Sequence, residues 1–259
     1  MIKTGICSIT LSKLPVEAVI DMVKEAGLDA IEWWGKDHVP DGDLVKAEKV
    51  KDLTLQAGIE ISSYGSYYHA GVSEHDGLNF QSVLDTAVAL GAPAIRVWAG
   101  DKNYEDASGG FIQKVIDDTM RIADMAAEKN INIIFEYHRG TFTNLHENAV
   151  KFAGQVPHEN VFFSWQSPHG YSCEQCLESI KGVLDRLKTI HVFHWTINEK
   201  DASVGFVRQP LVKGVDSWRR YVELLKSTGR DYYMLMEFVR DDSTQQFLQD
   251  AKVLKNLVL

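Results

Sequence analysis

The fold is decided by the stretch INIIFEYHRG, residues 131–140. Its first half is a run of apolar and β-branched residues, which predicts a strand buried on both faces, as in a parallel sheet. The run ends in Glu136 and His138, which share a face because side chains alternate along a strand. A carboxylate and an imidazole are costly at the end of an apolar strand unless they are paired or bound to a metal. We therefore expect both side chains to belong to a site.

The rest of the chain repeats this pattern of an apolar strand followed by an amphipathic helix. Eight strands are predicted, over residues 2–8, 30–34, 59–64, 94–99, 131–138, 161–165, 189–195 and 232–239. The helices that follow them are predicted over residues 15–27, 44–56, 80–90, 111–129, 144–154, 173–187, 218–227 and 244–258. Eight such units in 259 residues predict an α/β fold, a closed (β/α)8 barrel, with a single domain over residues 1–259. No G-x-G-x-x-G turn follows the first strand, which disfavours a doubly wound dinucleotide-binding sheet.

The composition argues against several classes of protein. A net charge of -9 disfavours nucleic acid as the main partner, because contacts of Lys and Arg to phosphates supply most non-specific affinity. No apolar run approaches the ~20 residues that a membrane span needs, and no signal-peptide pattern is evident, so we expect a cytoplasmic protein with no membrane partner. Three cysteines give no disulfide framework. Cys173 and Cys176 form a lone C-x-x-C, for which two ordinary helix-start cysteines are favoured over a redox pair or half a zinc site.

Polar residues at the strand ends are the candidates for chemistry, because reactive groups of such barrels gather there. Glu237, near the end of the eighth strand, repeats the situation of Glu136 on the fifth, and the two can converge across the barrel mouth. Such a pair can remove a proton from a carbon next to a carbonyl and return one from the opposite face. A divalent metal would polarise the carbonyl and stabilise the enediolate. The alternative is a pair of salt-bridged structural residues.

A histidine and a glutamine extend this candidate site. His191 offers the nitrogen that Zn or Mn favours beside carboxylate oxygens. His194 lies three residues further on and is expected on the opposite face, as a substrate contact. Gln166 is the weakest candidate ligand, because an amide oxygen brings no charge. Arg96 is expected to face inward and neutralise Glu136 or Glu32.

Substrate contacts are expected from loop and strand-end residues around the mouth. Arg208 suits bidentate contact with a carboxylate or phosphate, with a solvated loop arginine as the alternative. For His169 the choice between a ligand and a loop histidine stays open, and His38 and His69 are each balanced against a surface-loop role. The full set of expected substrate contacts is His38, His69, Trp98, His138, His169, His194 and Arg208.

Six short motifs, taken in order, resemble the xylose-isomerase-like superfamily of (β/α)8 TIM barrels, which includes sugar and sugar-phosphate isomerases and epimerases. They are Ile-Glu-Trp-Trp (31–34), Phe-Glu-Tyr-His (135–138), Ser-Trp-Gln-Ser-Pro-His (164–169), His-Val-Phe-His-Trp (191–195), Arg-Gln-Pro-Leu (208–211) and Met-Glu-Phe (236–238). The resemblance implies a metal quartet from strands five to eight, which falls on Glu136, Gln166, His191 and Glu237. Gln166 stands where the family has aspartate, so one negative charge is missing. In the family's epimerases the two glutamates also move the protons.

The expected function is a divalent-metal-dependent isomerase or epimerase of a sugar, keto-sugar or sugar phosphate, with Zn, Mn or Mg as the metal. One alternative is an endonuclease IV-like hydrolase, which Gln166, the charge of -9 and the lack of an Asp-x-His pair after strand seven disfavour. Another is a non-catalytic sugar-binding barrel with a degraded metal site, which Gln166 supports. The sequence leaves the oligomeric state open, a homo-oligomer included.

Overall fold

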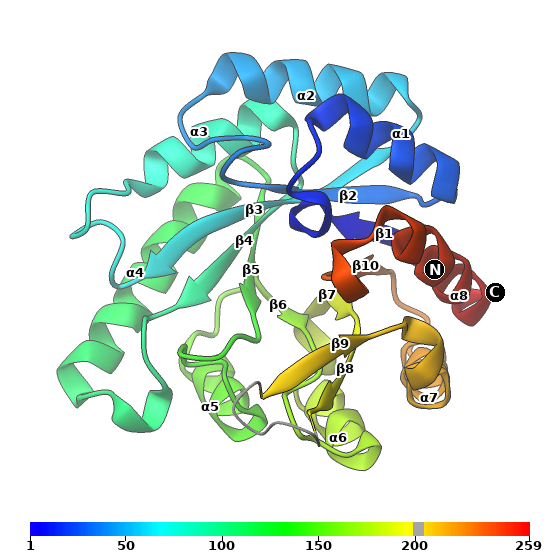
Figure 1. Cartoon of the computed structure of the whole chain (residues 1–259). Coiled ribbons are helices and arrows are strands. Elements are labelled where there is room, and N and C mark those ends of the chain that lie inside the picture. Colours follow the sequence, from blue (N-terminus) through cyan, green and yellow to red (C-terminus); the bar gives the residue numbers. More distant parts are fainter. Residues whose placement is uncertain (199–204) are drawn as a thin grey trace.

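The strands close into a parallel barrel with the helices arranged around its outside (Figure 1). The computed structural model describes residues 1–198 and 205–259. The order of strands around the ring is β1-β10-β7-β6-β5-β4-β3-β2, so that β1 closes the ring by pairing with β10 as well as with β2. The predicted (β/α)8 barrel is thereby confirmed.

The barrel strands are short apart from one. They are β1 (Ile2–Cys7), β2 (Ala30–Trp34), β3 (Glu60–Ala70), β4 (Ala94–Ala99), β5 (Asn132–Glu136), β6 (Val161–Trp165), β7 (Leu187–Val192) and β10 (Tyr232–Met236). The helices are α1 (Val16–Ala26), α2 (Leu44–Gln56), α3 (Phe80–Leu90), α4 (Gly109–Ala127), α5 (His146–Gln155), α6 (Cys173–Val183), α7 (Val215–Ser227) and α8 (Thr244–Val258). None of the helices in the described residues is long and apolar enough to cross a membrane.

The alternation of side chains along β5 decides that Glu136 faces the interior of the barrel. The ring of Phe135 is fully buried and lies 5.1 Å, centroid to centroid, from the ring of Phe152 on α5. Phe135 therefore points outward, into the layer between barrel and helices. Because side chains alternate along a strand, Glu136 points into the barrel. The apolar run thus seals the outer face while its last residue faces the interior.

Three strands around the candidate site end before the residue predicted for them. The strand predicted over residues 131–138 ends at Glu136. The strand predicted over residues 189–195 ends at Val192, and a separate antiparallel hairpin follows, made of β8 (His194–Ile197) and β9 (Phe206–Gln209). The strand predicted over 232–239 ends at Met236, because Phe238 adopts a left-handed backbone with φ of 56° that cannot continue a strand.

Strand β3 is much longer than the predicted range 59–64. It runs to Ala70 and so carries Tyr67 and His69 beyond the end of β2, whose last residue Trp34 pairs with Gly65. The residues after Tyr64 lie outside the predicted strand. They remain extended because β3 pairs with β4 again after an irregularity, with His69 opposite Trp98 and Ala70 opposite Ala99.

Candidate metal and active site

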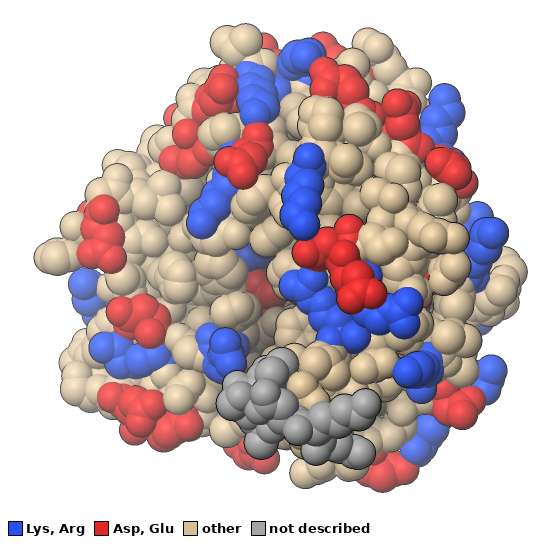
Figure 2. All heavy atoms as spheres, viewed as in Figure 1, with Lys and Arg blue, Asp and Glu red and all other residues tan. Residues whose placement is uncertain are grey.

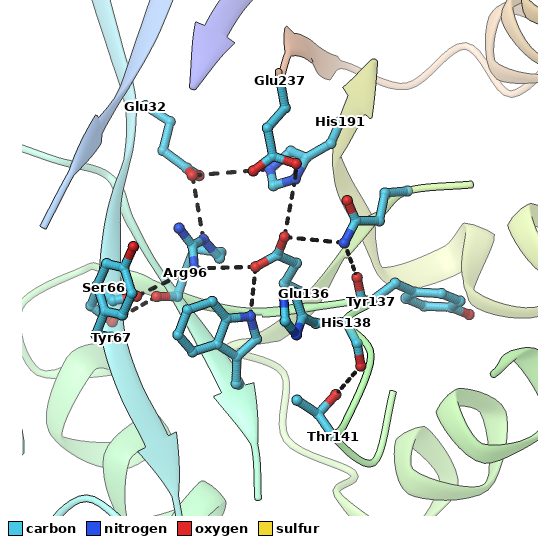
Figure 3. A network of polar contacts seen from close by, with 12 residues as sticks. Glu32, Ser66, Tyr67, Arg96, Glu136, Tyr137, His138, Thr141, His191 and Glu237 are labelled. Atoms are coloured by element: carbon cyan, nitrogen blue, oxygen red, sulfur yellow. Dashed lines mark hydrogen bonds and ion pairs between the residues drawn. The ribbon is translucent and has the colours of Figure 1, made fainter. Parts of the chain in front are cut away.

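Three side chains from separate strands meet inside the carboxyl end of the barrel (Figure 3). His191 on β7 places Nδ1 3.3 Å from Oε1 of Glu136 on β5 and 3.4 Å from Oε2 of Glu237, directly after β10. One ligand atom from each residue lies within 4.8 Å of the other two, and all three residues are buried. We call Glu136, His191 and Glu237 the central triad. Its dimensions suit one metal ion.

The backbone after β10 directs Glu237 into the triad. The Glu237 amide donates to the carbonyl oxygen of Val192 at 3.1 Å, which extends the contact between β10 and β7 by one residue. The next amide, of Phe238, donates to Oγ1 of Thr10 at 3.0 Å. These bonds hold the turn, including the left-handed Phe238, and so fix where the Glu237 carboxylate points.

The outer oxygen of Glu136 is held by two donors. Oε2 accepts a hydrogen bond from Nε1 of Trp98 at 2.6 Å and lies 3.1 Å from Nη1 of Arg96. The same arginine lies 3.3 Å, through Nε, from Oε1 of Glu32. The expectation that Arg96 neutralises a barrel glutamate is confirmed for both. Because Oε2 is occupied, Oε1 is the Glu136 oxygen that faces His191.

Burial and charge act in opposite directions on the ionisation of this cluster. Burial on its own would raise the pKa of Glu136, but the Arg96 guanidinium and His191 outweigh it and lower this pKa to about 2. Burial disfavours a charged His191, yet the neighbouring carboxylates of Glu237 and Glu136 raise the pKa of the imidazole well above its usual value. Burial raises the pKa of the Cys7 thiol. The carboxylates of Glu136 and Glu237 therefore form a pocket that favours cations.

The lowered pKa of Glu136 makes stability fall in acid. Unfolded, Glu136 takes up a proton near its ordinary value of 4.5, whereas the folded protein takes it up only near 2. Its contribution, on the order of 3 kcal/mol, is therefore present above pH 4.5 and lost as the pH falls towards 2. Urea unfolding between pH 5 and pH 2 should show a smaller fall for Glu136→Gln than for the wild type. Equal falls in both proteins would contradict this assignment.

Gln166 does not bring its oxygen to the central triad. Its Nε2 donates to the carbonyl oxygen of Tyr137, an obligatory acceptor, and lies 3.3 Å from Oε1 of Glu136. The amide nitrogen therefore faces Glu136, and Gln166 acts in this arrangement as a hydrogen-bond donor to a triad member. This differs from the expected ligand role, which needs the oxygen to turn inward.

A cavity of about 390 Å³ opens above the central triad. Glu136 and Glu237 form part of its floor. Three of the predicted substrate contacts, Trp98, His138 and His169, also line it. Tyr67, Arg96, Gln166, Phe193, Trp195 and Phe238 complete most of the wall. The space-filling view shows this hollow near the middle of the molecule, with residues of both charges around it (Figure 2). The volume falls in the range of small-molecule sites.

Four expected substrate contacts lie elsewhere. The prediction that His38 contacts substrate is corrected, because His38 is buried. Its ring nitrogens contact Oγ of Ser8 at 2.8 Å and the Leu14 carbonyl oxygen at 3.0 Å. Its role there is structural. His69 stands behind Trp98, with Nδ1 at 2.8 Å from the carbonyl oxygen of Gly100. His194 lines a smaller adjoining cavity.

Arg208, the fourth, is already paired. Its Nη1 lies 2.5 Å from Oδ1 of Asp242, and its guanidinium carbon lies 4.6 Å from the centroid of the Phe238 ring. Phe238 lines the cavity above the central triad, so the Phe238 ring lies between Arg208 and that cavity. Contact with a substrate would require Arg208 to leave Asp242.

Cys7 and Glu32 are buried beside His191. The sequence analysis considered Glu32 only as a partner of Arg96 and did not consider Cys7 for the site. Cys7, Glu32 and His191 form a second group whose possible ligand atoms lie within 4.8 Å of one another. Cys7 is the last residue of β1 and pairs in register with Glu32 on β2. Its position at the end of a strand could have indicated a place in the site. Because side chains alternate along a strand, Cys7 points to the side opposite to that of the apolar Ile6.

The closed barrel and the central triad define a class of protein, the (β/α)8 barrels with a carboxylate and histidine centre at the carboxyl end of the strands. The sequence profile of the xylose isomerase-like TIM barrel family matches residues 20–257. The chain belongs to this family, as the resemblance of its motifs implied.

Known proteins of two activities are similar to this chain. A 3-dehydroshikimate dehydratase of Bacillus anthracis is 23% identical over 281 aligned positions, which cover 98% of this chain and 97% of that protein. The structure of a probable 3-DHS dehydratase from Bacillus anthracis has a TM-score of 0.81 at 18% identity, covering 98% of this chain and 99% of that one. A 3-keto-D-glucoside 4-epimerase from E. coli has a TM-score of 0.73 at 15% identity, covering 99% of both chains.

Proposed function

We propose that this protein is a divalent-metal-dependent isomerase or epimerase of a sugar, keto-sugar or sugar phosphate. The observation that carries the proposal is the convergence of Glu136, His191 and Glu237 beneath a cavity of small-molecule size. Two carboxylates at the floor of a cavity are the groups needed to move a proton on a carbon next to a carbonyl.

The residues present fit a divalent ion. Both ring nitrogens of His191 are buried and make no hydrogen bond within the described residues, although Nδ1 faces two carboxylates. Buried polar atoms without partners are costly, and an ion would satisfy Nδ1 together with Oε1 of Glu136 and Oε2 of Glu237. One nitrogen and two oxygens suit Mn²⁺ or Zn²⁺, and the carboxylates also suit Mg²⁺. When bound, the ion would supply Lewis-acid polarisation of a substrate carbonyl.

The two glutamates differ in how firmly the protein holds them. Trp98 and Arg96 fix Oε2 of Glu136, whereas His191 is the one charged group within ion-pair distance of Glu237 among the described residues. We assign the removal of the substrate proton to Glu237, because its carboxylate is not committed to such donors. Glu136 faces the same cavity and is the candidate to act on the opposite side of the reacting carbon.

A dehydratase is the second candidate, favoured by the similarity to the 3-dehydroshikimate dehydratase over nearly the whole chain. Removal of water from the carbons beside a carbonyl begins with the same proton transfer, and the hydroxyl group then leaves with a second proton. His169 lines the cavity and packs against Trp195 and Phe206, so it is placed to supply that second proton.

The test is proton exchange at the carbon next to the carbonyl. The purified protein is stripped with a chelator, reloaded with Mn²⁺, Mg²⁺ or Zn²⁺, and incubated in D₂O with a panel of keto-sugars, sugar phosphates and 3-dehydroshikimate. We expect deuterium at that carbon by NMR only with a metal present, because the ion acidifies it. Isomerised sugars identify the first candidate, and loss of water by mass spectrometry identifies the second. Sugar binding without exchange would contradict both and support a non-catalytic barrel.

A further inference from the structure

The imidazole of His191 has a second nitrogen that faces away from the central triad. Nε2 lies 4.0 Å from Oε1 of Glu32 (Figure 3). Cys7 belongs to the same group of buried side chains. Neither neighbour forms a hydrogen bond with it in this structure. A histidine that binds a metal through one ring nitrogen commonly presents the other N–H to a carboxylate, which sets the orientation and basicity of the ring. Glu32 stands on the side where such a carboxylate belongs.

The protein holds Glu32 firmly in that position. Oε2 accepts a hydrogen bond from Oγ of Ser63 at 2.6 Å, and Oε1 lies 3.3 Å from Nε of Arg96. Gly65 packs directly against this pair, since a Cβ built there would lie 2.9 Å from both Nη2 of Arg96 and Oε1 of Glu32. A side chain at position 65 would therefore displace Arg96 or Glu32.

Glu32 also contributes to the net charge of the buried cluster. Glu32, Glu136 and Glu237 bring three negative charges, and Arg96 brings one positive charge. With a neutral imidazole, as metal binding requires, a divalent cation makes the whole buried cluster neutral. Without Glu32 the same cluster would carry a net positive charge once the ion is bound, which a buried site disfavours.

We propose that Glu32 is a positioning residue for the metal centre, which acts through His191 and supplies the negative charge that the amide of Gln166 does not. Arg96 ties it to Glu136, so that one guanidinium fixes the carboxylates on both sides of the imidazole. The inference rests on the proposed function, because it concerns the same metal ion. It assigns a role to Glu32 that needs no contact with substrate.

The experiment measures metal affinity and geometry in Glu32→Gln. Mn²⁺ binding is followed by calorimetry, and Co²⁺ is added to record the visible absorption spectrum, which depends on ligand geometry. We expect affinity to fall 10- to 100-fold and the Co²⁺ spectrum to change. The matched control is Glu60→Gln, which removes a carboxylate paired with Lys3 outside the metal centre and should change neither.

Three further variants keep the test decisive. Gln166→Asp in the Glu32→Gln background should restore affinity, because it returns a negative charge beside the triad. If Glu32→Gln does not fold, Glu32→Asp keeps the charge but draws it away from His191 and should also weaken binding. Cys7→Ser identifies the alternative, since a fall in affinity there and not in Glu32→Gln would make Cys7 the partner of Nε2 and overturn the proposal.

The outcomes separate this inference from the proposed function. A wild-type protein that binds no divalent ion contradicts both. A wild type that binds the ion and exchanges substrate deuterium, together with Glu32→Gln of equal affinity and spectrum, overturns the role of Glu32 alone.

Discussion

Glu136→Gln and Glu237→Gln are each expected to lower turnover of the substrate found by deuterium exchange by ~10²- to 10⁴-fold, the contribution typical of a positioned acid or base. Glutamine keeps the size of the side chain but can neither take up the proton nor offer an anionic oxygen to a cation. Both carboxylates lie at the cavity floor, on either side of Nδ1 of His191. Since they act on one reacting carbon, the double variant should lose much less than the product of the two single losses.

The measurement is kcat/KM with each variant saturated with metal, together with its metal content. Glu174→Gln is the control, because this exposed glutamate pairs with Arg220 on the surface and its loss should leave kcat/KM unchanged. Full turnover in a metal-loaded Glu136→Gln variant would refute an acid or base role for Glu136. Full turnover in Glu237→Gln would likewise refute our assignment of proton removal.

Arg96→Met is expected to destabilise the fold by about 3–5 kcal/mol, because it leaves Glu32 and Glu136 buried without their cation. Methionine fills a similar volume, so that lost packing adds little. The loss should shrink in acid, because Glu136 takes up a proton more readily once Arg96 no longer lowers its pKa, and it should shrink when a divalent ion is bound. Urea unfolding of the wild type and the variant, at pH 7 and in acid, measures these differences.

Arg121→Met provides the comparison on the surface. Arg121 pairs with Glu74 and Asp118 but is partly exposed, so we expect a loss of no more than about 1 kcal/mol. Losses of stability of equal size in the two variants would show that the ion pairs of Arg96 matter no more than those of a surface arginine, despite their burial. A loss at Arg96 that does not change with pH would show that unpaired carboxylates are not its cause.

The barrel was predictable because its information is local and repeated. Each buried strand is a short apolar run, and the strands predicted over residues 30–34, 94–99 and 161–165 coincide with β2, β4 and β6. Once the ring of strands was inferred, their carboxyl ends had to share one mouth. The proximity of Glu136, His191 and Glu237 followed from topology alone, and the structure brings these residues together.

The remaining features depend on contacts that sequence spacing does not encode. His194 and Trp195 follow β7 closely in the sequence, yet pairing with β9 separates them from the barrel. His38 has a loop position typical of a binding residue. Only the fold shows that both its ring nitrogens form hydrogen bonds, with Ser8 and with the backbone of Leu14. The orientation of Gln166 is set by the carbonyl group of Tyr137, which is 29 positions away in the sequence but adjacent in space.

The unequal strand lengths also shape the way in. In ring order β3 and β7 lie four strands apart, and the β8–β9 hairpin follows β7, so the long β3 and the hairpin stand on opposite sides of the opening. Each contributes an aromatic side chain to the cavity, Tyr67 from β3 and Trp195 from β8. A substrate on its way to the carboxylates therefore passes two aromatic side chains on opposite walls of the cavity, which can pack against the flat face of a sugar ring.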